Sequence, residues 1–331
     1  MMSGLVANMP ALNHLTEMTL RCSNWQHQQT DANVQLNAQL PSLTRMTLHG
    51  IPATIARQLI AVSSSLQTLQ VKCCAGVMSH QASSLCLPEL QHMQLDYLSA
   101  ALAIDLLSAT PALQKLVLAN VDDDQDGAVA AMNQLADVEL RSVKPQLIAT
   151  ILLAAPKLAH LSISHWTIYE GLAETIEVSK KAVSKLTQLR TLAIEQSRLS
   201  SSILLGVSSS SALESVKFVG THATRAIMRA LLLRLPALRT MSCEPILEEQ
   251  STPHDGRTAR LPSLESLTLG AADDFTLAGL ELPALRELDI DASALTQPLA
   301  LQQLPALVAF SIRKADVRRL DIEQFLANAP S

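Results

Sequence analysis

Apolar residues recur along the chain in one short phrase, in which two leucine-like residues three positions apart are followed by a third two positions later. This phrase, L-x-x-L-x-L, occurs thirteen times, and successive copies are on average about 24 residues apart. A repeat of this length predicts a solenoid of stacked coils, because one coil cannot bury its apolar face alone. The copies begin at Leu15, Leu43, Leu66, Leu90, Leu113, Leu135, Leu158, Leu189, Leu213, Leu238, Leu264, Leu285 and Leu307.

Each phrase predicts a short strand. Counting from its first leucine, period-two alternation points the fourth and sixth residues inward and the third, fifth, seventh and eighth outward. Many copies have a proline two residues ahead, which suits the position before a strand. Between the phrases, apolar residues at helical spacing predict helices near 55–60, 102–107, 147–152 and 226–231, and a longer one over 170–181.

The phrase and its period resemble those of the leucine-rich repeat family, and the resemblance covers about residues 12–325. It implies one α/β domain over 1–331, a horseshoe-shaped solenoid with a parallel sheet on the concave side and helices or irregular segments on the convex side. The alternative, a HEAT or armadillo solenoid, is disfavoured because it would need two clean helices per period of about 40 residues. Both ends stop within a repeat, so we expect either a longer array or ends that other contacts protect. The family's usual Asn or Cys is missing from the ninth position of the phrase, which holds Ser23, Ile51, Cys74, Leu98, Val121, Val143, Trp166, Ser197, Thr221, Ile246, Ala272, Ser293 and Ala315.

The composition agrees with a packed, non-basic protein. Apolar residues make up 48% of the chain, aromatic residues only 2%, and the net charge is -5. These values exclude a disordered acidic tail and disfavour nucleic acid as a partner. No signal peptide or membrane span is visible in the sequence. Its five cysteines lack the spacing of a disulfide framework, so we expect reduced thiols and a cytoplasmic protein.

The sequence shows no catalytic constellation, so we expect no enzyme activity, cofactor or small-molecule substrate. The nearest metal motif is the run Asp122, Asp124, Asp126 and Gly127, the first half of a calcium loop, but Asn133 replaces the acid expected at its twelfth place. The alternative is that these carboxylates cap a helical segment over 128–132 or are simply solvated. The second interpretation is favoured, and no metal site is expected.

The outward side chains of the strands remain as a binding surface. In copies four to seven they form a mixed, partly apolar patch, flanked by aromatic residues of the kind enriched among binding anchors. For Trp166 the alternative is that it fills the core. Near the end of the chain, Glu287, Asp289 and Asp291 form an acidic row that we expect to pair with Arg313 and Lys314 of the next strand. The residues predicted to contact a partner are Asp96, Tyr97, Lys115, Glu139, Arg141, His165 and Trp166.

These features predict a noncatalytic module that recognises another protein on its concave face. The resemblance is to intracellular members of the family, such as ribonuclease-inhibitor-like arrays and the substrate-recognition arrays of F-box proteins. It therefore leaves open the substrate-recognition part of a ubiquitin-ligase adaptor, a regulator of a small GTPase, or a bacterial effector that imitates host arrays.

Overall fold

The computed structural model describes residues 13–22, 39–73, 85–121, 129–166, 173–198, 203, 206–207, 210–222, 231–246, 259–270, 280–291 and 304–313. The chain forms two compact units, Met1–Leu158 and Ala159–Ser331. Thirteen strands in the described part correspond one to one with the thirteen phrases, six in the first unit and seven in the second. This is the predicted α/β arrangement of a leucine-rich repeat solenoid. A single domain over the whole chain stays a prediction.

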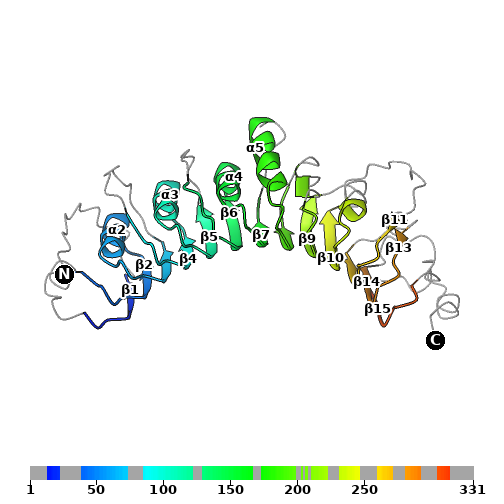
Figure 1. The fold of residues 1–331 in the computed structure, drawn as a ribbon, viewed down its shortest axis with the longest axis horizontal. Coiled ribbons are helices and arrows are strands. Elements are labelled where there is room, and N and C mark those ends of the chain that lie inside the picture. Colours follow the sequence, from blue (N-terminus) through cyan, green and yellow to red (C-terminus); the bar gives the residue numbers. More distant parts are fainter. Residues whose placement is uncertain are drawn as a thin grey trace. The chain divides into compact units, whose positions relative to one another are not determined.

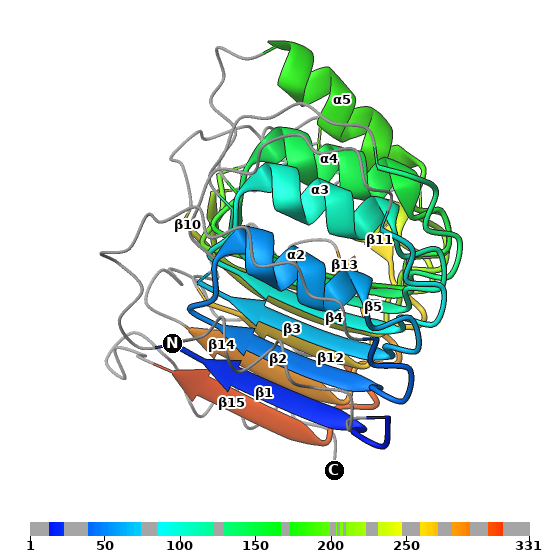
Figure 2. The ribbon, with the colours of Figure 1, turned by 90° about the vertical axis from the view of Figure 1, so that its left-hand side faces the viewer.

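The first unit is a parallel sheet with helices along one side. Figure 2 shows β1 to β5 in chain order, with α2, α3 and α4 stacked above them on one side of the sheet. The three helices bury the apolar residues whose spacing predicted them, such as Leu59, Leu106 and Ile151. The elements are β1 (Glu17–Arg21), β2 (Arg45–His49), α2 (Ala53–Ala61), β3 (Thr68–Lys72), β4 (His92–Asp96), α3 (Ala100–Ser108), β5 (Lys115–Val121), β6 (Asp137–Val143) and α4 (Pro145–Ala154).

The second unit repeats this plan. Its main strands pair in parallel in the order β7-β8-β9-β10-β12-β14-β15, and β11 pairs with β13 in a separate small sheet (Figure 1). The predicted longer helix is confirmed as α5, whereas the helix predicted near 226–231 falls almost wholly outside the described residues. The elements are β7 (His160–Ser164), α5 (Ala173–Ser184), β8 (Thr191–Glu195), β9 (Ser215–His222), β10 (Thr240–Ile246), β11 (Ala259–Arg260), β12 (Ser266–Leu269), β13 (Leu280–Glu281), β14 (Glu287–Asp291) and β15 (Ala309–Arg313).

A tight turn leads into each strand. The amide of Leu43 donates a hydrogen bond to the carbonyl of Leu40 at 3.2 Å, and Leu285 bonds Leu282 in the same way at 3.2 Å. Pro41 takes the second place of such a turn, where its fixed φ is already correct. The prolines therefore precede the strands because they fit a turn, which is a more specific reason than a missing donor before a strand.

The turn that follows each strand depends on one left-handed residue. In eight consecutive coils the eighth residue of the phrase has φ between 46° and 67°. Its amide extends the ladder to the next coil, as in the hydrogen bond from Cys73 to the carbonyl of Asp96 at 2.8 Å. The turn after each of these strands therefore closes through the backbone conformation of the eighth residue, without the family's usual Asn or Cys at the ninth. The eight residues are Gly50, Cys73, Tyr97, Asn120, Ser142, His165, Gln196 and Gly220.

The core lies between the strands and the returning segments. The fourth and sixth residues of the phrase are buried in almost every described strand, as Met93 and Leu95 are in β4. The exceptions are the two end strands, where Leu20 of β1 and both Phe310 and Ile312 of β15 are only half-buried. Inward alternation is therefore confirmed, and each coil adds two apolar side chains to a shared core.

Candidate partner-binding face

The side of the sheet opposite the helices carries the outward columns of the phrase. In β4, β5 and β6 the third and fifth residues are half-buried or exposed, while the fourth and sixth are buried. At the seventh position, Asp96 is half-buried and Arg141 is exposed, but Ala119 between them is buried. Parallel strands lie about 4.8 Å apart, so these columns form a regularly spaced polar surface.

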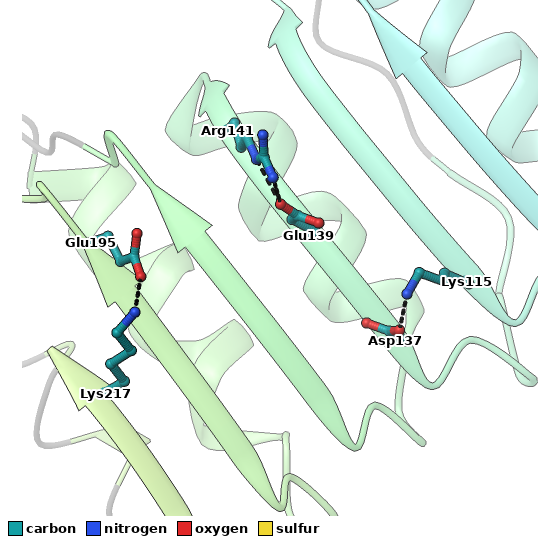
Figure 3. Close-up of polar contacts among 6 residues, drawn as sticks. All are labelled: Lys115, Asp137, Glu139, Arg141, Glu195 and Lys217. Atoms are coloured by element: carbon teal, nitrogen blue, oxygen red, sulfur yellow. Dashed lines mark hydrogen bonds and ion pairs between the residues drawn. The ribbon is translucent and has the colours of Figure 1, made fainter. Parts of the chain in front are cut away.

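Two ion pairs fix four side chains on this face in the first unit (Figure 3). Lys115 Nζ lies 2.7 Å from Asp137 Oδ2 on the neighbouring strand, and Arg141 Nε donates to Glu139 Oε1 at 2.6 Å within β6. The hydrogen bond to Asp137, together with its negative charge, holds the pKa of Lys115 above its ordinary value. The structure thus places Lys115, Glu139 and Arg141 on the face, as predicted.

Asp96 and Tyr97 lie where β4 ends. Asn120 Nδ2 donates a hydrogen bond to Asp96 Oδ1 at 2.9 Å, which links this edge of the face to the next coil. Tyr97 is 59% exposed and has φ of 54°. An exposed tyrosine beside a carboxylate can offer a partner both apolar contact and a charge-assisted hydrogen bond.

His165 belongs to the second unit and occupies the eighth position of its phrase. It is exposed, and its amide donates to the carbonyl of Glu195 at 3.0 Å, so its backbone is held in place. On the same strand, His160 Nδ1 lies 2.7 Å from Thr191 Oγ1. The structure therefore brings Asp96, Lys115, Glu139 and Arg141 together in one unit and places His165 in the other.

The prediction that Trp166 contacts a partner is wrong. Trp166 is only 1% exposed, and its backbone amide donates a hydrogen bond to Ser197 Oγ at 3.0 Å. The ninth position of the phrase points inward, because the left-handed residue before it turns the chain back into the coil. Of the two interpretations of Trp166, the core one holds. The apolar residues at the ninth position of other copies, buried in the structure, were the signal: Ile51, Leu98, Val121 and Val143.

A charged column at the second position of the phrase was missed by the sequence analysis. In the second unit it reads Arg190, Glu214, Arg239, Glu265, Arg286 along successive coils, and we call it the charged rail. Ion pairs join it in two places, Arg190 to Glu214 at 3.9 Å and Arg239 to Glu265 at 3.8 Å. Aligning the phrases and reading every column, including the second, would have revealed this alternation.

The predicted pairing of the acidic row is confirmed at one place. Arg313 Nε donates to Asp289 Oδ1 at 3.0 Å, from β15 to β14. In the same unit, Lys217 Nζ of β9 lies 2.6 Å from Glu195 Oε1 of β8 (Figure 3). Lys314 lies outside the described residues, so its pairing stays a prediction.

Within the described residues, no three His, Cys, Asp or Glu side chains come together in a way that could hold a metal ion. The half calcium loop falls within 122–128, outside the described part. The helix predicted over 128–132 is wrong where it can be checked, because residues 129–132 are not helical. The amide of Met132 donates a hydrogen bond to the carbonyl of Ala154 at 2.8 Å. In the same described part, no helix has the length and apolarity needed to cross a membrane.

Comparison with known proteins identifies the fold. No family model matches the sequence, and no curated protein is similar to it in sequence. Solved structures do match: the Toll–Spätzle complex of Drosophila gives 13% identity over 90% of this chain with a TM-score of 0.51. This chain spans only 43% of the chain that it matches there. The chain has the leucine-rich repeat fold.

Two further leucine-rich repeat structures match less closely. The mouse RP105/MD-1 complex gives 13% identity over 87% of this chain and 58% of its own, with a TM-score of 0.45. The TLR13–ssRNA13 complex gives 16% identity over 85% of this chain and 47% of its own, with a TM-score of 0.39. Likenesses at these levels add nothing about the site or its ligand.

Proposed function

We propose that this leucine-rich repeat protein is a noncatalytic recognition module that binds another protein on the open face of its sheet. The observation that carries the proposal is the regular backbone under that face. Ladder hydrogen bonds hold the outward side chains at fixed spacing, whereas the returning segments vary in length between coils. Fixed placement lowers the ordering cost of binding.

A protein suits this face better than a nucleic acid does. A nucleic-acid site needs uncompensated cations to replace the counterions of phosphates. Here Lys115, Arg141 and Lys217 each lie against a carboxylate, and the whole chain carries a net charge of -5. The Toll structure with the same fold is a complex with the protein Spätzle, which supports the same class of partner.

The residues proposed to meet the partner are six of the seven predicted from the sequence, with the buried Trp166 left out. Five of them belong to the first unit, where they lie at the end of β4 or form the two ion pairs. The sixth belongs to the second unit and is the exposed residue that directly follows β7. They are Asp96, Tyr97, Lys115, Glu139, Arg141 and His165.

The proposal is tested by reversing charges on the two sides of the coils. A partner is first isolated from lysate and identified, and its affinity for purified variants is then measured by calorimetry. Reversal of Lys115 and Arg141 together should weaken binding, while reversal of Lys180 and Lys181, exposed on α5, should leave it unchanged. If the α5 pair abolishes binding and the pair on the face has no effect, the sheet face is not the binding surface.

We also propose a cytoplasmic location with reduced thiols. Among the described cysteines, Cys22, Cys73 and Cys86 are free, and Cys243 is buried. Thiol counting under denaturing conditions, without prior air oxidation, should return all five cysteines of the chain. A count of three or one would contradict a reducing compartment.

A further inference from the structure

Tyr97 occupies a backbone position that does not suit it. Left-handed φ favours Gly or Asn and costs other residues free energy, and bulky residues are unusual there. The same column also holds other residues that are neither Gly nor Asn, such as Cys73 and Gln196. Tyr97 has the bulkiest side chain of the column and is 59% exposed, so it recovers little of that cost by burial. A strained, exposed aromatic residue points to a role outside the fold.

The carboxylate of Asp96, the residue before Tyr97, forms no ion pair with any residue that the structure describes. The other acids on the face of the first unit are paired, Glu17 with Arg45 at 3.2 Å, Asp137 with Lys115 and Glu139 with Arg141. Asp96 makes a hydrogen bond to Asn120 but no ion pair with any residue that the structure describes.

The residues at the seventh position of the neighbouring phrases explain why Asp96 forms no ion pair with them. Arg141 is two strands from Asp96, about 10 Å away across the buried Ala119, and it already bonds Glu139. Lys72 is the register partner of Asp96 on β3, yet the two form no salt bridge within 4.0 Å. The Asn120 amide instead holds Asp96 toward β5, which keeps an acceptor available next to the tyrosine.

From this juxtaposition we propose that Asp96 and Tyr97 form the docking position for a cationic side chain, Arg or Lys, of the protein partner. The inference rests on the proposed function and deepens it by naming the chemistry of one contact. The carboxylate supplies a charge-assisted hydrogen bond, and the ring face attracts the same cation. Lys72, on the neighbouring strand, repels an incoming cation, so that cation binds better when Lys72 is removed.

The probe is a phage-displayed library of random peptides, selected on the full-length protein and counter-selected on its Tyr97→Asn variant. Synthetic copies of the selected peptides are then compared with versions in which each Arg is replaced by citrulline, its neutral analogue. We expect Arg or Lys in the selected peptides, and a loss of affinity of about tenfold or more with citrulline or with Asp96→Asn. Lys72→Ala should tighten binding.

Stability provides a second readout that a merely structural tyrosine would not give. Tyr97→Asn should lose peptide binding and yet keep or raise the thermal midpoint, because Asn tolerates left-handed φ. Gln196→Asn, at the same position of a coil in the second unit, is the matched control. It should show the same gain in thermal midpoint with peptide binding unchanged.

The outcomes separate this inference from the proposed function. Selected peptides that need Lys115 and Arg141 but carry no cation, or that bind equally well with citrulline, overturn the cation site and leave the binding face standing. Peptides that bind regardless of Asp96, Tyr97, Lys115 and Arg141, or a selection that yields none, overturn the cation site and speak against the face as well.

Discussion

The outward columns of the two units differ although their strands follow the same phrase. At the second position the first unit carries neutral residues, among them Gln67, Gln91 and Gln114, whereas the second unit carries the charged rail. At the third position the first unit has ion-paired charges such as Lys115 and Asp137. The second unit has hydroxyls there in four successive coils, from Thr191 to Ser266, with Thr240 bonded to Ser215 at 2.7 Å.

The inward columns of the two units are alike. Leu116 and Leu118 in β5 are buried in the same way as Leu161 and Ile163 in β7. The shared core restricts the inward positions because each apolar layer must pack on the next, while water accepts almost any polar side chain outside. The fold therefore depends on the inward columns, and binding specificity can vary along the outward ones.

The largest expected effect tests whether both units depend equally on that core. Leu116→Asp and Leu161→Asp should each lower the free energy of unfolding by at least about 3 kcal/mol, because each buries an unpaired charge. Chemical denaturation followed by circular dichroism measures the loss. Ser162→Asp, on the outward side of the same strand as Leu161, should cost less than about 0.5 kcal/mol. Equal losses for Leu161→Asp and Ser162→Asp would show that the inward assignment is wrong.

The next effect compares the two glycines of the left-handed column. A methyl group on Gly50 would lie 2.3 Å from the carbonyl oxygen of Cys22, whereas at Gly220 the nearest atom is Gln196 Cγ at 3.5 Å. Both substitutions carry the conformational cost of left-handed φ, about 1 kcal/mol, and Gly50→Ala adds a backbone clash. Gly50→Ala should thus cost about 2 to 4 kcal/mol and Gly220→Ala about 1 kcal/mol in the free energy of unfolding.

That difference is measured by urea denaturation of the two variants under the same conditions. Gly50→Asn and Gly220→Asn are informative controls, because Asn tolerates the dihedral angles but still places a Cβ against Cys22 in the first case. Should the two Ala variants prove equally stable, the close approach of the first coils would not be a constraint on the fold.

A smaller effect concerns the Lys115–Asp137 pair. Since the folded pKa of Lys115 is raised above 10.5, its contribution to stability is fully present below the unfolded pKa and is lost as pH rises through the folded value. The pair is solvent-accessible, so we expect less than about 1 kcal/mol. Stability of the wild type and of Lys115→Gln, measured from neutral to alkaline pH, should converge at high pH. In the background of Asp137→Asn the pH dependence due to Lys115 should shrink, and persistence of the full effect would rule out this pair as its source.

The smallest effect tests the charged rail itself. A double-mutant cycle of Arg239→Gln and Glu265→Gln should give a coupling below about 0.5 kcal/mol that falls as salt is added. Transplanting the pattern to the first unit as Gln91→Arg and Gln114→Glu should yield a coupling of the same size. A coupling above about 1 kcal/mol in the second unit alone would mean that the charged rail stabilises this unit by more than an exposed, salt-screened ion pair does.

Much of the fold could be predicted from the phrase, and the failures occurred where conformation mattered. The strands and the helices α2, α3, α4 and α5 are confirmed, because their burial follows simple periods of two and of about 3.6 residues. Trp166 was assigned to the binding surface because aromatic residues are enriched among binding anchors, whereas the left-handed residue before it turns the ninth position into the core. The helix expected over 128–132 is not formed at the described residues 129–132, and the apolar spacing that suggested it covers little more than one turn.

The sequence by itself determined the number of coils, the inward residues of each strand and the net charge of -5, since these follow from spacing and composition. Only the tertiary structure decided which outward side chains act together. Lys115 and Asp137, or Asp96 and Asn120, are 22 and 24 residues apart in the chain and meet because parallel strands stack in register. Ion pairs and free carboxylates depend on distances of a few ångströms between different coils, and no local pattern along one coil encodes them.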